Sequence, residues 1–286
     1  MIRRIFRGPF DYVHSLRNWK NCSKFLEENK NLEGKYKNRR CFVIGNGGSI
    51  NSQDLSKLKN EITIVSNSFF KHPSLNSWQP TYYCIVDSIH FSEIEFTSSF
   101  FSELTQSVKT TNFCFPVVNK EIIDTLMVLN SFKKYFFFFH NSLAETSIRE
   151  LNLDKPIPGV QSVSQFEIML AIYMGCSPIY LMGMDHDWLK YEPNMDNERS
   201  YQHFYSDQTV DNYAKRKYNY SFSYKTDLVN ILRLWEGYEN LLSLSVKEDI
   251  KILNATKGGY LDVFERIDYE KIFKNDQYNV IPINTE

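Results

Sequence analysis

The sequence predicts an α/β fold, a mostly parallel sheet with helices on both faces and a long lid insertion. Three observations support this prediction. Strand-like and helical segments alternate along the chain, as in parallel sheets. A short apolar strand runs directly into a glycine-rich turn at 41–49. The 286 residues, 42% of them hydrophobic, are enough to bury a sizeable core.

The strands are expected where short apolar runs are bounded by polar or turn-forming residues. These runs are 41–44, 62–66, 82–86, 112–118, 135–139, 179–182 and 250–253. Apolar residues recur at helical spacing in two longer segments, 162–174 and 226–247, and the first ends before Gly175. Residues 187–224 are polar, rich in tyrosine and without periodicity. Such a long loop after a strand end is interpreted as a lid, with disorder without function as the alternative.

The charge distribution predicts a basic N-terminal arm, 1–40, followed by one domain, 41–286. The arm holds eleven Lys and Arg residues against four acidic ones, whereas the whole chain has a net charge of −1. Either the arm lies on an anionic membrane surface or it packs as a solvated helix on the domain. Because the rest of the chain is acidic, nucleic acid is not an expected partner.

The expected cellular location follows from patterns that are absent from the sequence. It contains no apolar run long enough to span a bilayer and no signal-peptide pattern. Its five cysteines have no metal-ligand spacing and are typical of a reducing compartment. We expect a cytoplasmic protein, with the inner face of the membrane as a further location through the arm.

The glycine-rich turn Gly45-Asn46-Gly47-Gly48-Ser49 is the first candidate site. Glycines let the backbone approach a ligand closely, and the N–H groups of the following helix can face a phosphate. The turn lacks the third glycine of the dinucleotide motif and the lysine of the P-loop. An ordinary strand-to-helix turn is the alternative.

Polar residues also follow three other strands, and parallel strands place such residues at one edge of the sheet. Asn67 follows 62–66, Asp87 follows 82–86, and Asp185-His186-Asp187 follows 179–182. Any one of them can instead be a turn former or helix cap. Asp185 and Asp187 could hold Mg²⁺ or Mn²⁺, and Asp185 could equally bind a sugar hydroxyl or cap the lid.

Two serines and two histidines complete the candidates. Ser162 and Ser164 open the helix near 162, and we expect one to cap the helix and the other to bind a nucleobase or ribose. His186 and His203 lie in or beside the lid, where an imidazole can act as a general base at neutral pH.

Three segments together resemble a known family. The loop 44–50 is similar to the phosphate loop of bacterial sialyltransferases of glycosyltransferase family 42 and of the MptE-like proteins, which include motility accessory factors. Ser162-Val163-Ser164, followed by a helix and a strand ending at Asp185, resembles their second motif. The segment 251–261, with Asn254-Ala255-Thr256 and a Gly-Gly turn, resembles the MptE-like pattern.

The resemblance implies a Rossmann-like nucleotide-binding domain and a set of donor contacts. It assigns phosphate and ribose to the glycine loop, and the nucleotide or sugar to residues beyond it. The implied donor contacts are Gly45, Asn46, Gly47, Ser49, Asn67, Ser162, Ser164 and lid tyrosines among Tyr191, Tyr201 and Tyr205. Asp87 joins this set because it follows a strand at the same edge. The family's histidine base aligns with Phe222, which cannot accept a proton. Either His203, His186, Asp185 or Asp187 replaces it, or the reaction differs.

The predicted function is transfer of a nonulosonic acid of sialic, pseudaminic or legionaminic type. A CMP-activated donor would pass it to a bacterial surface glycan, with inversion and without a metal or other cofactor. The partners are the CMP-sugar and a glycan or lipid-linked acceptor; a homo-oligomer is left open. The alternatives are an MptE-like pyrophosphokinase that uses ATP and Mg²⁺, and a nucleotide-binding protein without catalysis.

Overall fold

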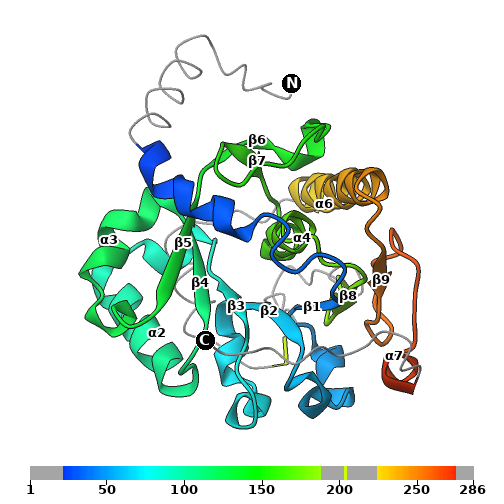
Figure 1. Ribbon diagram of the computed structural model, residues 1–286, viewed down its shortest axis with the longest axis horizontal. Helices are drawn as coiled ribbons and strands as arrows, with labels where there is room; N and C mark the ends of the chain where they lie inside the picture. The colour runs from blue at the N-terminus through cyan, green and yellow to red at the C-terminus, as the bar shows by residue number, and fades with distance from the viewer. Residues whose placement is uncertain (1–21, 188–202, 205–223, 275–286) are drawn as a thin grey trace.

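A parallel sheet of seven strands forms the centre of the molecule, in the order β5-β4-β3-β2-β1-β8-β9 (Figure 1). This computed structural model describes residues 22–187, 203–204 and 224–274. A second sheet pairs β6 with β7. The strands are β1 (Cys41–Ile44), β2 (Ile62–Ser66), β3 (Tyr82–Cys84), β4 (Asn112–Pro116), β5 (Lys133–Phe137), β6 (Phe139–Ser142), β7 (Ile157–Gly159), β8 (Ile179–Met182) and β9 (Ile252–Asn254).

The strand order reverses beside β1, and this reversal creates a binding edge. The chain runs outward from β1 to β5 and then returns to place β8 on the other side of β1. In the register, Ile44 pairs with both Val65 of β2 and Met182 of β8, so these three strands end at the same level. Open α/β sheets bind ligands outside the carboxyl ends of the strands at such a reversal.

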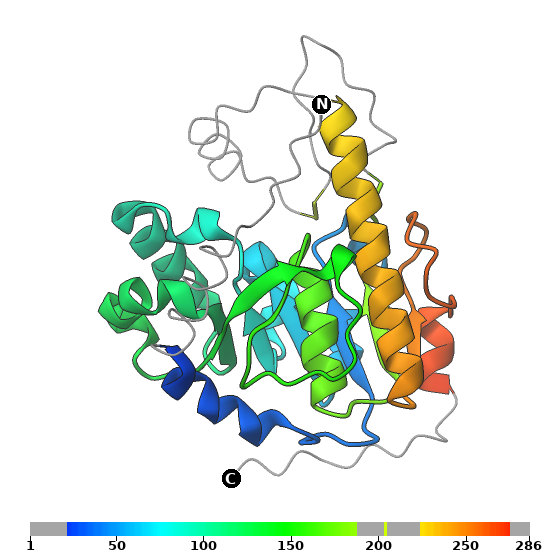
Figure 2. The ribbon, with the colours of Figure 1, turned by 90° about the horizontal axis from the view of Figure 1, so that it is seen from above.

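Helices cover both faces of the main sheet, which confirms the predicted fold class. Phe42 and Ile44 belong to the core on one face, whereas Cys41 and Val43 belong to the core on the other. The helices are α2 (Ile94–Ser107), α3 (Lys120–Thr125), α4 (Val163–Tyr173), α6 (Tyr224–Lys247) and α7 (Tyr269–Lys274). Figure 2 shows α4 and α6 packed side by side, and both lie over the core that contains Cys41 and Val43.

Short 3₁₀ helices fill many connections where longer α-helices are usual in this fold class. They are η1 (Glu27–Leu32), η2 (Gly48–Ser52), η3 (Leu55–Leu58), η4 (Asn67–Lys71), η5 (Pro73–Asn76), η6 (Ser88–Phe91), η7 (Val117–Asn119), η8 (Met127–Leu129) and η9 (Leu143–Glu145). Because η2, η4 and η6 begin within four residues of the ends of β1, β2 and β3, they bring their first residues to the binding edge.

Several predicted boundaries differ from the observed ones because strand pairing decides where a strand ends. The aromatic run predicted as one strand at 135–139 is divided between two sheets. Phe137 ends β5 in the main sheet, and Phe139 begins β6, which pairs with β7. The strands predicted at 82–86 and 112–118 end earlier, at Cys84 and Pro116. An apolar run fixes neither which sheet a strand joins nor where pairing stops.

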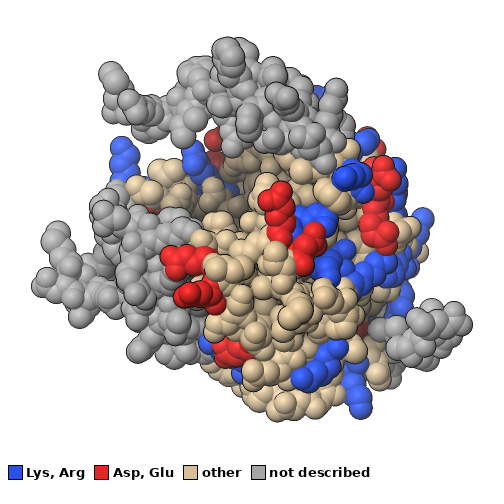
Figure 3. All heavy atoms as spheres, turned by 90° about the vertical axis from the view of Figure 1, so that its left-hand side faces the viewer, with Lys and Arg blue, Asp and Glu red and all other residues tan. Residues whose placement is uncertain are grey.

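The described part of the basic arm packs against the domain. Leu26 and Leu32 are fully buried, and the buried Asn29 amide donates to the carbonyl oxygens of Phe136 and Leu153, each at 2.7 Å. On the face seen in Figure 3, basic side chains lie beside acidic ones. The domain body therefore includes residues before position 41, while residues 1–21 of the arm lie outside the described ranges.

No helix in the described ranges is both long and apolar enough to cross a bilayer. Most of the predicted lid, 187–224, lies outside the described residues.

Candidate functional site

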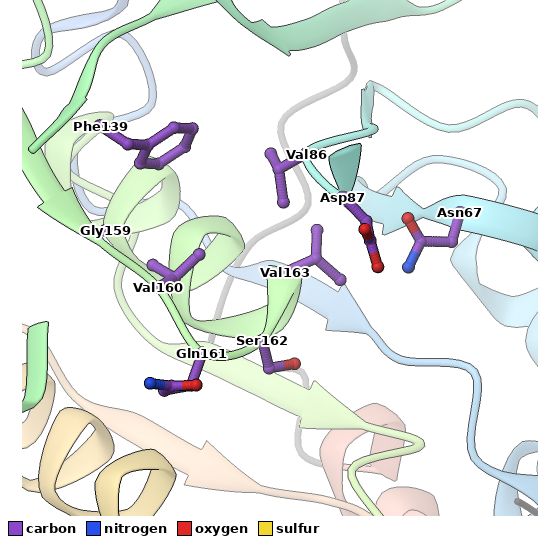
Figure 4. Close-up of a pocket in the computed structure, with 9 residues that line it drawn as sticks. All are labelled: Asn67, Val86, Asp87, Phe139, Gly159, Val160, Gln161, Ser162 and Val163. Carbon is purple, nitrogen blue, oxygen red and sulfur yellow. The ribbon is translucent and has the colours of Figure 1, made fainter. Parts of the chain in front are cut away.

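A pocket of about 500 Å³ opens at the carboxyl ends of β2 and β3, beside the N-terminus of α4. Figure 4 shows Asn67 and Asp87 on one side and Phe139 on another, with Ser162 and Val163 at the start of α4. The lining residues are Asn67, Val86, Asp87, Phe139, Gly159, Val160, Gln161, Ser162 and Val163. Three polar residues predicted from separate parts of the sequence thus meet in one cavity.

Asn67 and Asp87 give the pocket its polar wall. Asn67 adopts a left-handed conformation with φ of 51°, which asparagine tolerates better than most residues. Its buried side-chain oxygen has no hydrogen-bond partner among the described residues. Asp87 lines the pocket and also caps η6, because its carboxylate accepts from the N–H of Ile89 at 3.0 Å. The Asn67 oxygen therefore lies buried beside the pocket without a hydrogen-bond donor among the described residues.

The prediction that Ser162 or Ser164 caps α4 is confirmed for the position of Ser162 but not for a capping hydrogen bond. Ser162 occupies the N-cap position, but its side chain makes no capping hydrogen bond, and Ser164 lies inside the helix. The two hydroxyl oxygens are 2.8 Å apart, and the Ser164 hydroxyl lies 2.6 Å from the hydroxyl of Tyr238 on α6. The packing of α6 against α4 supplies a partner that the local sequence does not reveal.

The N–H groups of both Gly45 and Gly47 in the glycine loop donate to carbonyl groups within the protein. Gly45 donates to the carbonyl of Met182 at 2.8 Å, and Gly47 donates to the carbonyl of Gly183 at 3.0 Å. A β-carbon on Gly47 would lie 2.5 Å from the Asp185 carboxyl carbon and 2.6 Å from the Gly183 oxygen. These glycines let the loops after β1 and β8 touch one another, whether or not a phosphate also approaches.

Asp185 also joins the loop after β8 to the loop after β1. One carboxylate oxygen accepts from the N–H of Ser49 at 2.9 Å, and the other accepts from the Ser49 hydroxyl. The Asp185 carbonyl also accepts from the N–H of Tyr260 at 2.8 Å. Within the described ranges, no group of three or more His, Cys, Asp or Glu side chains is placed to bind a metal ion.

Asn46 lies between the glycine loop and β2. Its side-chain amide donates to the Ser66 carbonyl at 3.1 Å, and its buried side-chain oxygen has no hydrogen-bond partner in the described part of the chain. It therefore resembles Asn67 in keeping an acceptor unused at this edge.

His186 lies at the end of β8 with its imidazole Nε2 2.7 Å from the Tyr238 hydroxyl. Its ring also packs against Trp235, with ring centroids 5.9 Å apart. Burial lowers the pKa of His186 to about 3, so the imidazole is neutral at physiological pH. A general base works best when its pKa is near the operating pH, so His186 is poorly matched to that role.

His203 is brought to the glycine loop, where it forms an isolated antiparallel bridge with Gly47. The next N–H, of Phe204, donates to the Asn46 carbonyl at 3.1 Å. The Phe204 ring packs edge-on against His72, with centroids 5.0 Å apart. An exposed histidine from the predicted lid region is thereby anchored at the binding edge. The other lid candidates, Tyr191, Tyr201 and Tyr205, lie outside the described residues, as does Phe222.

Two residues near the site were missed from the sequence. Glu167 on α4 is fully buried, and neither carboxyl oxygen has a hydrogen-bond partner among the described residues. Burial raises the pKa of Glu167 to about 8. The signal for Glu167 was a lone charge within the apolar segment 162–174. Tyr238 lies in the segment 226–247, where its position in the apolar pattern gives no sign of a polar role.

Comparison with solved structures shows which folds the chain resembles. A MAf glycosyltransferase from Magnetospirillum magneticum AMB-1 superposes with a TM-score of 0.51 at 10% identity, over 91% of this chain and 41% of that protein. The chain thus spans less than half of the Magnetospirillum protein.

The sialyltransferase CstII from Campylobacter jejuni, in complex with the substrate analogue CMP-3FNeuAc, gives a TM-score of 0.48 at 16% identity, covering 80% of this chain and 86% of CstII. CstII in complex with cytidine-5′-monophosphate gives a TM-score of 0.46 at 14% identity, with coverage of 87% and 89%. No curated protein sequence matches the chain.

A family profile described as 6-hydroxymethylpterin diphosphokinase MptE-like matches residues 14–191. The match covers more than half of the 286 residues and includes the glycine loop, the pocket residues and the Ser162–Asp185 segment. By this match, together with the parallel sheet and its order, the chain belongs to the MptE-like family and has a Rossmann-like fold of the kind seen in the MAf glycosyltransferase.

Proposed function

We propose that the protein is a glycosyltransferase that moves a nonulosonic acid from a CMP-activated donor to a bacterial surface glycan. The supporting observation is the pocket that unites Asn67, Asp87 and Ser162. The family resemblance assigns Asn67 and Ser162 to the donor nucleotide, and the fold brings them together although they are 95 positions apart in the sequence. The fold similarity to the MAf glycosyltransferase is consistent with this proposal.

Each polar group of the site has a task in this reaction. The unused oxygen of Asn67 and the carboxylate of Asp87 accept hydrogen bonds from ribose or sugar hydroxyls, and Ser162 meets the base or ribose. The donor's sugar–phosphate bond breaks through an oxocarbenium-like transition state, so the enzyme must stabilise the departing phosphate and deprotonate the acceptor. Lid tyrosines stabilise the departing phosphate. His203, which pairs with Gly47, is the general base that deprotonates the acceptor. A positioned base is typically worth about 10²–10⁴-fold in rate.

The acceptor is a glycan, and a lipid-linked glycan at the inner face of the cytoplasmic membrane suits the basic residues at the N-terminus. Transfer proceeds with inversion and without a metal. The hydrogen bonds between Asp185 and Ser49 support the metal-independent form of the reaction.

The second candidate is a pyrophosphokinase that uses ATP and Mg²⁺. The matching family profile is described as that of a pterin diphosphokinase, which favours this candidate. Its magnesium site would have to use Asp185, and the contact with Ser49 argues against that use. Nucleotide binding without catalysis is the third candidate, because Phe222 stands where the resemblance expects the base.

Thermal denaturation with CMP, CDP, UDP, GDP and ATP, each with Mg²⁺ and with EDTA, separates these candidates. A ligand present at 100 times its Kd stabilises a protein by about 2.7 kcal/mol. We expect selective stabilisation by CMP that is unchanged by EDTA. Stabilisation by ATP alone, lost in EDTA, would overturn the proposal in favour of the pyrophosphokinase.

Turnover distinguishes catalysis from binding. CMP release from CMP-nonulosonates is measured with a glycan acceptor present, for the wild type and for His203→Ala. We expect CMP release by the wild type and a loss of about 10²-fold or more in the variant. CMP binding without release by the wild type would support the non-catalytic candidate, and full turnover by the variant would exclude His203 as the base.

A further inference from the structure

A continuous chain of hydrogen-bonding groups runs from the pocket to the end of β8. The Ser162 hydroxyl in the pocket lies 2.8 Å from that of Ser164, which lies 2.6 Å from the hydroxyl of Tyr238. The Tyr238 hydroxyl in turn lies 2.7 Å from Nε2 of His186. All three separations are normal hydrogen-bond lengths. The chain joins residues from α4, α6 and the end of β8.

The middle of this chain has no access to solvent. Tyr238 is fully buried, and Ser164 is almost so. The Tyr238 ring is held by Phe264, which packs edge-on with ring centroids 5.9 Å apart, and by the tilted ring of His186 at 5.4 Å. Because water does not reach these hydroxyls, each must satisfy its hydrogen bonds with its neighbours in the chain.

The protons of these three hydroxyl groups can point in only two ways along the row of hydrogen bonds, because each hydroxyl has one proton to donate. If Nε2 of His186 accepts, Tyr238 donates to it, Ser164 donates to Tyr238 and Ser162 donates to Ser164. The Ser162 oxygen then offers the pocket only an acceptor. If Nε2 carries the proton, every donor points the other way and Ser162 has its proton free for a ligand.

The His186 imidazole determines which of the two proton arrangements forms. Burial lowers the pKa of His186 to about 3, which keeps the ring neutral. A neutral imidazole has one donor nitrogen and one acceptor nitrogen, so its tautomer sets the direction of all three hydroxyls. No net proton therefore moves along the hydrogen-bonded groups to His186. The tautomer of His186 instead determines whether the Ser162 hydroxyl acts as a donor or an acceptor.

We propose that Tyr238 is a positioning residue that couples the tautomer of His186 to the hydrogen-bonding character of Ser162 in the pocket. Ser162 is then a specificity-determining residue. It receives a hydroxyl or amino donor of a ligand when Nε2 of His186 is unprotonated, and a carbonyl or ring-nitrogen acceptor when Nε2 is protonated. A ligand bound at Ser162 selects the tautomer of an imidazole that lies three hydrogen bonds away.

The test uses the ligand-free protein with ¹⁵N-labelled histidine, because the ¹⁵N shifts of the imidazole ring report its tautomer. His186→Gln identifies the His186 resonances among the six histidines. We expect Ser162→Ala, which removes the pocket end of the chain, to change the His186 ¹⁵N shifts although Ser162 does not contact His186. Val163→Ala is the matched control, since Val163 lines the same pocket but lies outside the chain.

Tyr238→Phe tests whether the coupling passes through the tyrosine hydroxyl. It removes one oxygen and keeps the ring, so the packing against Phe264 is retained. In this background, Ser162→Ala should leave the His186 shifts unchanged. Unchanged His186 shifts on Ser162→Ala in the wild-type background overturn the proposal. An equal change in Val163→Ala, or in the Tyr238→Phe background, also overturns it, because the effect would then be general packing.

A second arm adds CMP to the labelled wild type and rests on the proposed function. We expect CMP to shift the His186 tautomer in the wild type and not in Tyr238→Phe. If CMP does not bind, as shown by an unchanged melting temperature, the proposed donor is wrong, and the ligand-free arm still decides the coupling. Binding of CMP with no change at His186 contradicts the coupling alone.

Discussion

Two neighbouring regions at the same edge of the sheet differ in how they use their polar groups, although each contains an asparagine, Asn46 or Asn67, whose buried side-chain oxygen has no partner among the described residues. At the ends of β1 and β8, the N–H groups of Gly45, Gly47 and Ser49 are paired within the protein, the last with Asp185. At the ends of β2 and β3, Asn67 keeps a buried oxygen without a partner among the described residues, next to a pocket.

The difference shows that a recognisable motif need not be the part of a site whose polar groups are left for a ligand. The glycines of the motif are needed because the loops after β1 and β8 approach each other closely there. The pocket is built from residues that follow β2 and β3 and from Ser162 and Val163 of the second motif. Substitutions in the first region should mainly change stability, and substitutions in the second should mainly change binding.

The largest effect is expected from Gly47→Ala. The added β-carbon would lie 2.5 Å from the Asp185 carboxyl carbon, and both loops would have to move. We expect the free energy of unfolding, measured by urea denaturation, to fall by about 3 kcal/mol. Gly258→Ala is the comparison: Gly258 has a left-handed φ of +77°, whereas Gly47 has a φ of −64°, but no atom lies within 4 Å of the added β-carbon, so only about 1 kcal/mol should be lost. Equal losses would mean that the two loops do not constrain each other.

Asp185→Ala should follow in size. It removes both hydrogen bonds from Ser49 to a carboxylate, and such bonds to charged groups support a loss of about 2 kcal/mol in the free energy of unfolding. The comparison is Asp87→Ala in the pocket region, which removes one capping hydrogen bond and should cost about 1 kcal/mol. Urea denaturation of both variants checks the order. A smaller loss for Asp185→Ala than for Asp87→Ala would contradict the contrast between the regions.

Glu167 predicts a pH dependence. Its pKa is raised in the folded state to about 8, above that of an unfolded glutamate, so the folded state binds the proton more tightly and stability falls as pH rises toward 8. His186 acts oppositely, because its pKa is lowered to about 3, but only about 0.4 kcal/mol of its contribution remains to be gained above pH 6.5. From pH 6.5 to 8 the free energy of unfolding should therefore fall by about 1.5 kcal/mol.

Glu167→Gln isolates this contribution, since the amide has the same shape and no proton to lose in this range. Its free energy of unfolding, measured by urea denaturation at each pH, should stay level between pH 6.5 and 8 where that of the wild type falls. Parallel curves for the two proteins would show that Glu167 does not titrate in the folded state over this range.

The smallest change in stability is expected from Asn67→Gly. Glycine accepts the left-handed conformation at this position, so the free energy of unfolding should change by less than about 1 kcal/mol. The side-chain amide is lost, and we expect CMP affinity to fall by about 10-fold, as measured by calorimetry. Ser49→Ala is the comparison and should change CMP affinity by less than about twofold. An equal loss in Ser49→Ala would show that the glycine loop opens to the ligand.

The fold could be predicted from the sequence because its signals are local. The buried strands Cys41–Ile44 and Ile62–Ser66 are short apolar runs, and α6 shows helical spacing over most of its length. The positions of Asn67 and Asp87 after their strands were equally local, and parallel pairing was enough to expect them at one edge. The division of the aromatic run at Phe137 and Phe139 could not be predicted, because it depends on which strand each half pairs with.

By itself, the sequence determined the alternation of strands and helices, the glycine turn, and the polar residues at the strand ends. Only the tertiary structure decided how these groups are used. Ser49 and Asp185 are 136 positions apart, and Ser164 and Tyr238 are 74 apart. Such partners are set by strand order and helix packing, which bring distant segments within hydrogen-bond range. Backbone propensity acts over a few residues, whereas these contacts depend on the whole chain.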